Sequence, residues 1–328
     1  MKKFSKNKEI SLVIGSIYQD LNVLIYLLSK LGDNISYIKE IICVVSGVNT
    51  NKKLKRASKL NEIIKIKSEI IYIERIIMPG EARNIGINKS KYEYICFLDS
   101  HPIPESNWLS KTIDILEKKN LKGLIGNLEY IPTNEFEDCF IAATYGKYPI
   151  LTIPGTLIEK KSFMEIGLFI PNYRSGEDAE WIRRSKLLNP SLSQVKPIPC
   201  KYIGLKGMNF IELCKKWYTY YKTTIDPRIY SQRIIYISFL ISFFLLLAFS
   251  WNDKVADWDQ NSFYYVPHIS KIVISLIVAI YFIYRMIILP LKKKVKILDF
   301  NLIKFIKFIY ISTILDLVKL TAFIVHKK

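Results

Sequence analysis

Residues 78–104 read MPGEARNIGINKSKYEYICFLDSHPIP, and the rest of the chain is best interpreted outward from this stretch. Its opening Pro-Gly pair indicates a turn into a helix, whose exposed N–H groups and positive dipole end favour a phosphate. Residues 92–98 are rich in β-formers and fit a buried strand. Asp99 and His101 follow at the carboxyl end of that strand, the edge of an open α/β sheet where ligands bind.

Asp99 and His101 carry the donor types of a divalent-metal site. Because they are two residues apart, their side chains leave an extended chain on the same side and can approach one cation. A carboxylate oxygen with an imidazole nitrogen suits Mn²⁺ or a similar ion better than Mg²⁺, which prefers oxygen ligands. Arg83, in the preceding helix, adds a fixed charge for the phosphate. An isolated Asp-x-His pair is more often a solvated strand end, so this site depends on the surrounding motif.

Apolar segments that alternate with helical patterns predict the fold of the first half. The predicted strands are nearly all apolar, as parallel strands covered on both faces are; they are residues 10–17, 38–45, 69–77 and 92–98. Between the first two, Leu and Ile recur at helical spacing and Gly32 lies where a helix would stop. This order predicts an α/β domain with a doubly wound, mostly parallel sheet. Residues 121–158 are expected to add mixed strands at the sheet edge.

Composition and charge limit the classes of partner. With 48 Lys and Arg against 29 Asp and Glu, the formal charge is +19, which suits nucleotide diphosphates, lipid phosphates or a membrane surface. Nucleic acid is not expected, because half of the residues are hydrophobic, the apolar ones form membrane-length runs, and no nucleic-acid motif is recognised. The five cysteines lack C-x-x-C spacing, which predicts reduced, buried thiols of a cytosolic domain.

The last hundred residues predict a membrane region. Apolar runs predict spans at about 234–250 and 269–290, the second with Lys271 and Arg285 close enough to its ends to snorkel. The loop between them is acidic and their outer flanks are basic, so the positive-inside rule places the flanks and the N-terminal domain in the cytoplasm. The final apolar stretch, about 301–325, carries four charged side chains, so an interfacial helix fits it as well as a third span does.

These patterns divide the chain into three parts. Residues 1–209 form the α/β domain, and residues 233–328 form the membrane region. Between them, residues 210–232 mix basic and aromatic side chains, as is typical of a segment at the lipid headgroup level. A plain surface helix explains that composition equally well.

The central stretch resembles the signature of family 2 glycosyltransferases of the GT-A fold, an Ala-Arg-Asn-x-Gly helix followed by a strand and an Asp-x-Asp motif. Here the last Asp is His101, and an Asp-x-His version is a known variant in the related polypeptide N-acetylgalactosaminyltransferases. The resemblance covers roughly residues 9–205. It implies a Rossmann-like GT-A fold, a nucleotide-sugar donor, and a divalent metal ion, Mn²⁺ or Mg²⁺, held by Asp99 and His101. The donor would also contact Arg83 and Asn84.

The first half departs from the family pattern. After the second strand the family usually carries Asp-Asp-Gly-Ser, where this chain has Val-Ser-Gly-Val at residues 45–48. Ser16 and Ser46 could bond the nucleotide instead, although loop serines are more often turn residues. Residues 199–204 offer no further His ligand of the kind that GT-A enzymes frequently supply. Either water and phosphate oxygens complete the metal sphere, or Lys201 partly replaces the cation.

A second site follows Gly176, where Glu177 and Asp178 open an amphipathic helix. Adjacent acids at a helix start are, by themselves, residues that the helix dipole favours. In this context they resemble the Glu-Asp pair of inverting GT-A enzymes, whose Asp is the usual general base. The resemblance therefore implies that Asp178 takes the proton of the acceptor, with Glu177 beside it.

The sequence as a whole predicts a hexosyl-transferring, inverting enzyme that moves a sugar from a nucleotide-sugar to a lipid-linked or cell-envelope glycan acceptor. Polyprenyl phosphate itself is the alternative acceptor. A non-catalytic membrane scaffold with the same fold is the alternative of another class, because the base-contacting Asp is missing and His101 replaces an Asp. The expected location is the bacterial inner membrane, multi-pass, with the catalytic domain facing the cytoplasm.

Overall fold

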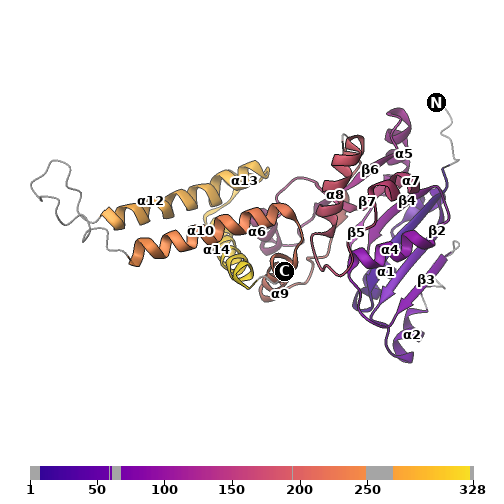
Figure 1. The fold of residues 1–328 in the computed structure, drawn as a ribbon, viewed down its shortest axis with the longest axis horizontal. Helices are drawn as coiled ribbons and strands as arrows, with labels where there is room; N and C mark the ends of the chain where they lie inside the picture. The colour runs from indigo at the N-terminus through magenta and orange to yellow at the C-terminus, as the bar shows by residue number, and fades with distance from the viewer. Residues whose placement is uncertain (1–7, 59, 61–67, 194, 249–268, 326–328) are drawn as a thin grey trace, which may run out of the picture. The chain divides into compact units, whose positions relative to one another are not determined.

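The fold comes from a computed structural model that describes residues 8–58, 60, 68–193, 195–248 and 269–325 (Figure 1). The chain forms two compact units, here named the sheet unit and the helical unit. The sheet unit consists of Met1–Thr133, Tyr148–Met208 and Thr223–Asp226. The helical unit consists of Asn134–Lys147, Asn209–Lys222 and Pro227–Lys328.

The sheet unit contains an eight-stranded sheet in the order β3-β2-β1-β4-β7-β6-β8-β5. The strands are β1 (Ile10–Ile17), β2 (Ile38–Ser46), β3 (Ser68–Ile73), β4 (Tyr94–Asp99), β5 (Pro102–Ile103), β6 (Gly123–Tyr130), β7 (Ile150–Glu159) and β8 (Cys200–Tyr202). The first four strands along this order, β3 to β4, are all parallel. This half of the sheet agrees with the predicted parallel arrangement and with its predicted strands.

The second half of the sheet is mixed, which corrects the expectation of a mostly parallel sheet. β7 runs antiparallel to β4, β6 antiparallel to β7, and β5 antiparallel to β8, while β8 is parallel to β6. β7 also lies in the interior of the sheet beside β4, not at its edge as expected. A uniformly apolar strand shows that both faces are covered, but it does not show the direction of the strand or its neighbours.

Helices cover both faces of the sheet, so the doubly wound architecture is confirmed. The helices of the sheet unit are α1 (Leu21–Ser29), α2 (Asn51–Ala57), α4 (Pro79–Lys89), α5 (Trp108–Lys118), α7 (Lys160–Ile166) and α8 (Glu177–Leu188). One core joins α1 and α5 to strand residues such as Leu12, and the other joins α4, α7 and α8 to residues such as Val13. Adjacent residues of β1 thus enter opposite cores, as the alternation of side chains along a strand requires.

The close packing of α4 on β1 explains the glycine of the Ala-Arg-Asn-x-Gly motif. A Cβ atom built on Gly86 would lie 2.4 Å from Cγ1 of Val13, so only a glycine lets the helix approach this closely. Six residues earlier, a Cβ on Gly80 would lie 3.0 Å from Cβ of Phe169. The helix is therefore fixed on the strand beside it and on the segment that follows α7. This positions Arg83, which lies between the two glycines.

The helical unit is built from α6 (Glu135–Ala143), α9 (Phe210–Thr223), α10 (Pro227–Ala248), α12 (Ile269–Ile283), a π-helical turn η4 (Tyr284–Ile288), α13 (Leu289–Lys292) and α14 (Leu302–Ile324). Within it, α14 packs against both α6 and α10. Aromatic side chains of α9 pack inside this unit: the Trp217 ring lies 6.2 Å from that of Phe140, and the Tyr221 ring 5.4 Å from that of Phe323.

One helical stretch that the structure describes, Ser275–Lys292, is long and apolar enough to cross a membrane. The first predicted span is helical within α10 as far as Ala248, and its remaining residues lie outside the described part of the chain. The last predicted segment is the continuous helix α14, whose charges find partners in the helical unit. Lys304, for example, lies 2.7 Å from Asp138. The multi-pass arrangement stays a prediction.

We expect Gly86→Ala to lower the free energy of unfolding by about 1–3 kcal/mol, because the new methyl overpacks the contact with Val13. Chemical unfolding of the detergent-purified protein, followed by circular dichroism, measures this change. Val13→Ala removes the methyl that clashes, so the double variant should be more stable than the two single changes together predict. Strict additivity would show that the two residues are not coupled.

Candidate active site

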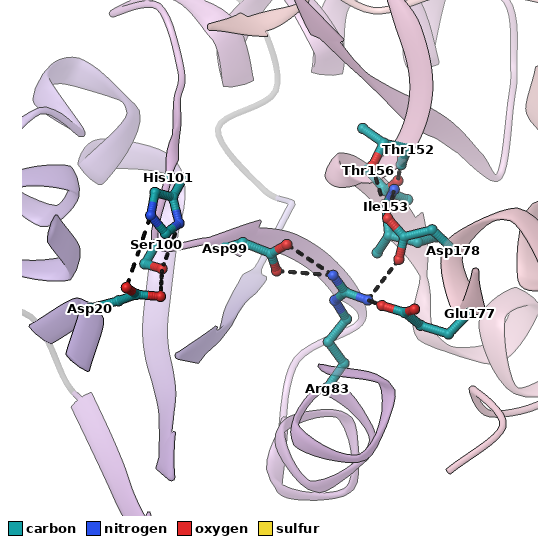
Figure 2. A network of polar contacts seen from close by, with 10 residues as sticks. All are labelled: Asp20, Arg83, Asp99, Ser100, His101, Thr152, Ile153, Thr156, Glu177 and Asp178. Atoms are coloured by element: carbon teal, nitrogen blue, oxygen red, sulfur yellow. Dashed lines mark hydrogen bonds and ion pairs between the residues drawn. The ribbon is translucent and has the colours of Figure 1, made fainter. Parts of the chain in front are cut away.

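The guanidinium of Arg83 joins three carboxylates at the carboxyl edge of the sheet (Figure 2). Its Nη2 donates to both oxygens of Asp99, at 3.0 and 2.9 Å. Its Nη1 donates to Oδ1 of Asp178 at 2.7 Å and to Oε1 of Glu177 at 3.2 Å. The last residue of β4 and the first turn of α8 therefore meet on one side chain of α4, which is itself 2% exposed.

Glu177 and Asp178 lie in different environments although they are neighbours in the sequence. The Glu177 side chain is 8% exposed and that of Asp178 is 26% exposed. Burial, followed by the negative charge of Asp178, raises the pKa of Glu177 to about 7, while Arg83 acts in the opposite direction. Of the pair, Asp178 is thus the carboxylate that a substrate can reach, and Glu177 is a buried group that titrates near neutral pH.

Asp178 is oriented from a second side by β7. Its Oδ2 accepts a hydrogen bond from Oγ1 of Thr152 at 2.8 Å and one from the backbone N–H of Ile153 at 3.2 Å (Figure 2). With Arg83 on Oδ1, three of the roughly four acceptor positions of the carboxylate are occupied. One position remains for an incoming hydroxyl. The sequence did not reveal Thr152, because nothing in it placed β7 beside β4.

His101 lies with Asp20 and Ser100, away from the Arg83 cluster (Figure 2). Its Nε2 is 4.0 Å from Oδ1 of Asp20, and its Nδ1 is 3.2 Å from Oγ of Ser100. Ser100 Oγ also lies 3.5 Å from Oδ2 of Asp20. Asp20 was not predicted, although an acid just after the strand β1, at the same sheet edge as Asp99, is a signal that could have found it.

Asp99 and His101 contact different partners in this structure. The chain bends at Ser100 and His101, so the extended geometry that the prediction assumed is absent. Asp99 turns toward Arg83, whereas the His101 ring lies beside Asp20 (Figure 2). Across the residues that the structure describes, no three or more His, Cys, Asp and Glu side chains are grouped to hold a metal. The metal assignment therefore stays a prediction.

The other residues predicted for the donor lie around this edge. Ser46 Oγ donates to the backbone oxygen of Ser16 at 3.5 Å, so the two serines are adjacent at the ends of β1 and β2. The Asn84 side chain instead bonds the backbone of Phe169, donating at 2.8 Å and accepting at 3.0 Å. Asn84 thus ties α4 to the segment after α7. Contact of these residues with a nucleotide stays a prediction.

The strand β8 brings an aromatic side chain beside His101. Pro102 pairs with Tyr202 across β5 and β8, and the ring centroids of His101 and Tyr202 are 5.9 Å apart. Lys201, the neighbouring residue, points to Glu105, with Nζ 3.6 Å from its carboxylate. Lys201 is therefore paired with an acid outside the Arg83 cluster.

Comparison with known proteins agrees with this fold. Residues 13–161 match the family model of glycosyl transferase family 2. No curated protein sequence matches the chain. Among solved structures, mannosyltransferase PcManGT from Pyrobaculum calidifontis, in complex with GDP-Man and Mn²⁺, is 10% identical with a TM-score of 0.50, covering 94% of this chain and 88% of that one. Residues 1–349 of S. aureus TarS in complex with UDP-GlcNAc are 14% identical with a TM-score of 0.43, and 64% of each chain is covered.

The sheet unit, with acidic groups at the carboxyl edge of its strands, has the GT-A architecture of glycosyltransferases. The match at residues 13–161 identifies a glycosyl transferase family 2 domain within this unit. The solved structures are too distant in sequence to show more than the fold.

The raised pKa of Glu177 predicts a pH-dependent stability. The folded protein holds the proton of Glu177 more tightly than the unfolded chain does. The protonated Glu177 therefore contributes its full stabilisation below about pH 4.5, and this contribution is lost as the pH rises through about 7. Glu177→Gln cannot ionise and should therefore gain stability relative to the wild type over that range, by on the order of 2–3 kcal/mol. Unfolding curves at several pH values measure the difference.

The exposed Glu165→Gln variant is the matched control for an acid-to-amide change in the same unit. A difference between Glu177→Gln and the wild type that stays constant with pH would show that Glu177 does not carry a raised pKa.

Proposed function

We propose that the protein transfers a sugar from a nucleotide-sugar to an acceptor on a lipid or a cell-envelope glycan, with inversion at the anomeric carbon. The observation that carries this proposal is the Arg83 cluster, which fixes Asp178 in place while leaving one acceptor position free. The mannosyltransferase structure with the same architecture is a complex with GDP-Man, which supports a nucleotide-sugar as the class of donor.

Asp178 acts as the general base when the acceptor is a hydroxyl. As the acceptor oxygen bonds to the anomeric carbon, the bond from that carbon to the nucleoside diphosphate breaks, and the hydroxyl proton passes to Asp178. A positioned base of this kind contributes about 10²–10⁴ in rate. Arg83 holds the carboxylate in orientation throughout, and Thr152 fixes its second oxygen. The base therefore loses little entropy on reaching its reactive geometry.

Polyprenyl phosphate is the second candidate acceptor, and it makes a different demand on Asp178. A phosphate monoester has its second pKa near 6 and is largely ionised at pH 7, so it attacks without giving up a proton. The buried positive charge of the helical unit, described below, is the observation that favours a phosphate-bearing lipid. The two acceptors can therefore be distinguished by how strongly the reaction depends on Asp178.

We place the protein at the bacterial cytoplasmic membrane, with the sheet unit in the cytoplasm. The stretch Ser275–Lys292 supports a membrane contact, and its basic end continues into Lys293, Lys294 and Lys296. By the positive-inside rule, this end faces the cytoplasm. A nucleotide-sugar made in the cytoplasm would then reach the site without crossing the membrane.

We expect Asp178→Asn to lower nucleotide release from the matching donor about 10²–10⁴-fold with a hydroxyl acceptor, and less than tenfold with a lipid phosphate. The assay uses detergent-purified protein, a panel of UDP-, GDP- and dTDP-sugars, and either bare polyprenyl phosphate or a glycosylated lipid. Glu165→Gln controls for the loss of a surface charge in the same unit. If no donor is turned over by the wild type and none binds, the non-catalytic scaffold is the better interpretation.

Metal dependence is tested in the same assay with Mn²⁺, Mg²⁺ or EDTA. From the predicted role of Asp99 and His101 we expect release to be lost in EDTA and restored by Mn²⁺. His101→Asp, which recreates Asp-x-Asp, should shift the preference toward Mg²⁺, since oxygen ligands favour that ion. Full activity in EDTA would contradict the metal assignment and leave the Asp178 assignment intact.

A further inference from the structure

The helical unit buries an ion pair between its π-helical turn and α14. Arg285, in η4, is 6% exposed, and its Nε donates to Oδ2 of Asp316 at 2.6 Å. The hydroxyl of Tyr281 donates to the same oxygen at 2.8 Å. Asp316 is therefore held by two donors, while Nη1 of Arg285 is buried and has no hydrogen-bond partner in the described part of the chain. This guanidinium keeps an unused donor that points into the unit.

Two lysines lie near this pair. Lys319 is 8% exposed, and its Nζ donates to the neutral amide oxygen of Gln232 at 2.8 Å. It also lies over the rings of Tyr236 and Tyr221, at 4.5 and 4.8 Å from their centroids. Lys293, just after α13, donates to the backbone carbonyl of Thr144. Both ammonium groups thus donate to neutral oxygens and not to carboxylates.

The cations of this cluster act on one another. Burial, followed by the positive charges of Arg285 and Lys319, lowers the pKa of Lys293 to about 8, whereas the negative charge of Asp316 opposes them. One carboxylate thus faces three cations. Enclosed charge without a partner of opposite sign is costly, because neither water nor a counter-ion compensates it. An excess of two positive charges inside a helical unit is a site prepared for an anion.

The backbone around Arg285 departs from a regular α-helix. Arg285 lies in a π-helical turn, Tyr284–Ile288, and such turns occur frequently at functional sites. Pro290 follows within α13 and cannot donate a backbone hydrogen bond, so regular helix is interrupted here. Arg285 in this turn forms its ion pair with Asp316 of α14.

We propose that Arg285, Lys293 and Lys319 form a binding site for the phosphate group of a lipid, the acceptor of the proposed transfer. The excess of two positive charges equals the charge of a fully ionised phosphate monoester. A guanidinium with a free N–H suits phosphate oxygens. An apolar tail is expected because α12 exposes apolar side chains along its length, such as Leu276 and Ile280. This inference rests on the proposed function for the identity of the lipid, but its test does not require turnover.

The test measures binding to the full-length protein in detergent by thermophoresis, with three probes: a polyprenyl monophosphate, the polyprenyl alcohol and inorganic phosphate. Lys319→Met removes the charge but keeps an unbranched side chain over the aromatic rings. Lys307→Met is the matched control, since Lys307 lies on the same helix, exposed, and pairs with Glu135. Nucleotide binding by each variant confirms that the sheet unit is folded.

We expect the lipid phosphate to bind wild type and Lys307→Met equally, and Lys319→Met about tenfold or more weakly, as the loss of one charge-assisted contact implies. The alcohol should bind far more weakly than the phosphate. Arg285→Gln provides a second loss of charge in case Lys319→Met disturbs the fold. Equal binding of alcohol and phosphate, or unchanged binding in both charge-removing variants, would overturn the site. Inorganic phosphate binding as tightly as the lipid would overturn the lipid assignment.

These outcomes are independent of the transferase assay. A protein that binds lipid phosphate through Lys319 but releases no nucleotide from any donor would keep the site and lose the proposed function. A protein that transfers sugar but binds the lipid phosphate independently of the cluster would keep the proposed function and lose the proposed lipid-phosphate site.

Discussion

The sheet unit depends on the burial of one guanidinium among three carboxylates. Without Arg83, the acids at the end of β4 and at the start of α8 would repel one another at a buried edge. Because Arg83 is nearly inaccessible, its position is set by the packing of α4, and that packing requires glycine at two points along the helix. The arrangement of these three carboxylates is therefore a consequence of helix-on-sheet packing. The eleven-residue helix α4 thus both packs on the sheet and orients the three carboxylates.

The same constraint separates the roles of Glu177 and Asp178. Glu177 lies against the narrow contact at Gly80, where a Cβ would come within 3.5 Å of its Cγ, and it is excluded from solvent. Asp178 reaches toward β7 and accepts bonds from Thr152 and Ile153. Successive residues of a helix point in different directions. The side chain of Glu177 is therefore buried, whereas that of Asp178 is more accessible and is oriented by Thr152. Because Glu177 is buried and Asp178 is more accessible, the two carboxylates cannot have interchangeable roles.

The sequence predicted the part of the fold that depends on local pattern. β1 begins and ends where its apolar run does, Asp99 closes β4, and α8 begins at Glu177 as its acids indicated. The sequence could not show contacts between distant segments. Arg83 was expected to bind a phosphate, yet it is bonded to Glu177 and Asp178, which lie 94 and 95 positions further along the chain. His101 was expected to approach the same cation as Asp99; its ring lies beside Asp20, whereas Asp99 is bonded to Arg83. The position of β7, and hence Thr152, followed from neither periodicity nor motif.

Both units bury an arginine beside acids, but with opposite charge balance. Around Arg83, three carboxylates share one cation, so the sheet unit has an excess of negative charge. Around Asp316, one carboxylate faces three cations, so the helical unit can take up an anion. Neither imbalance is expected of a purely structural ion pair, because full compensation inside the protein costs less than an uncompensated charge. The two imbalances match the two kinds of group that a transfer to a lipid phosphate or its glycan must hold, an acceptor proton and a phosphate.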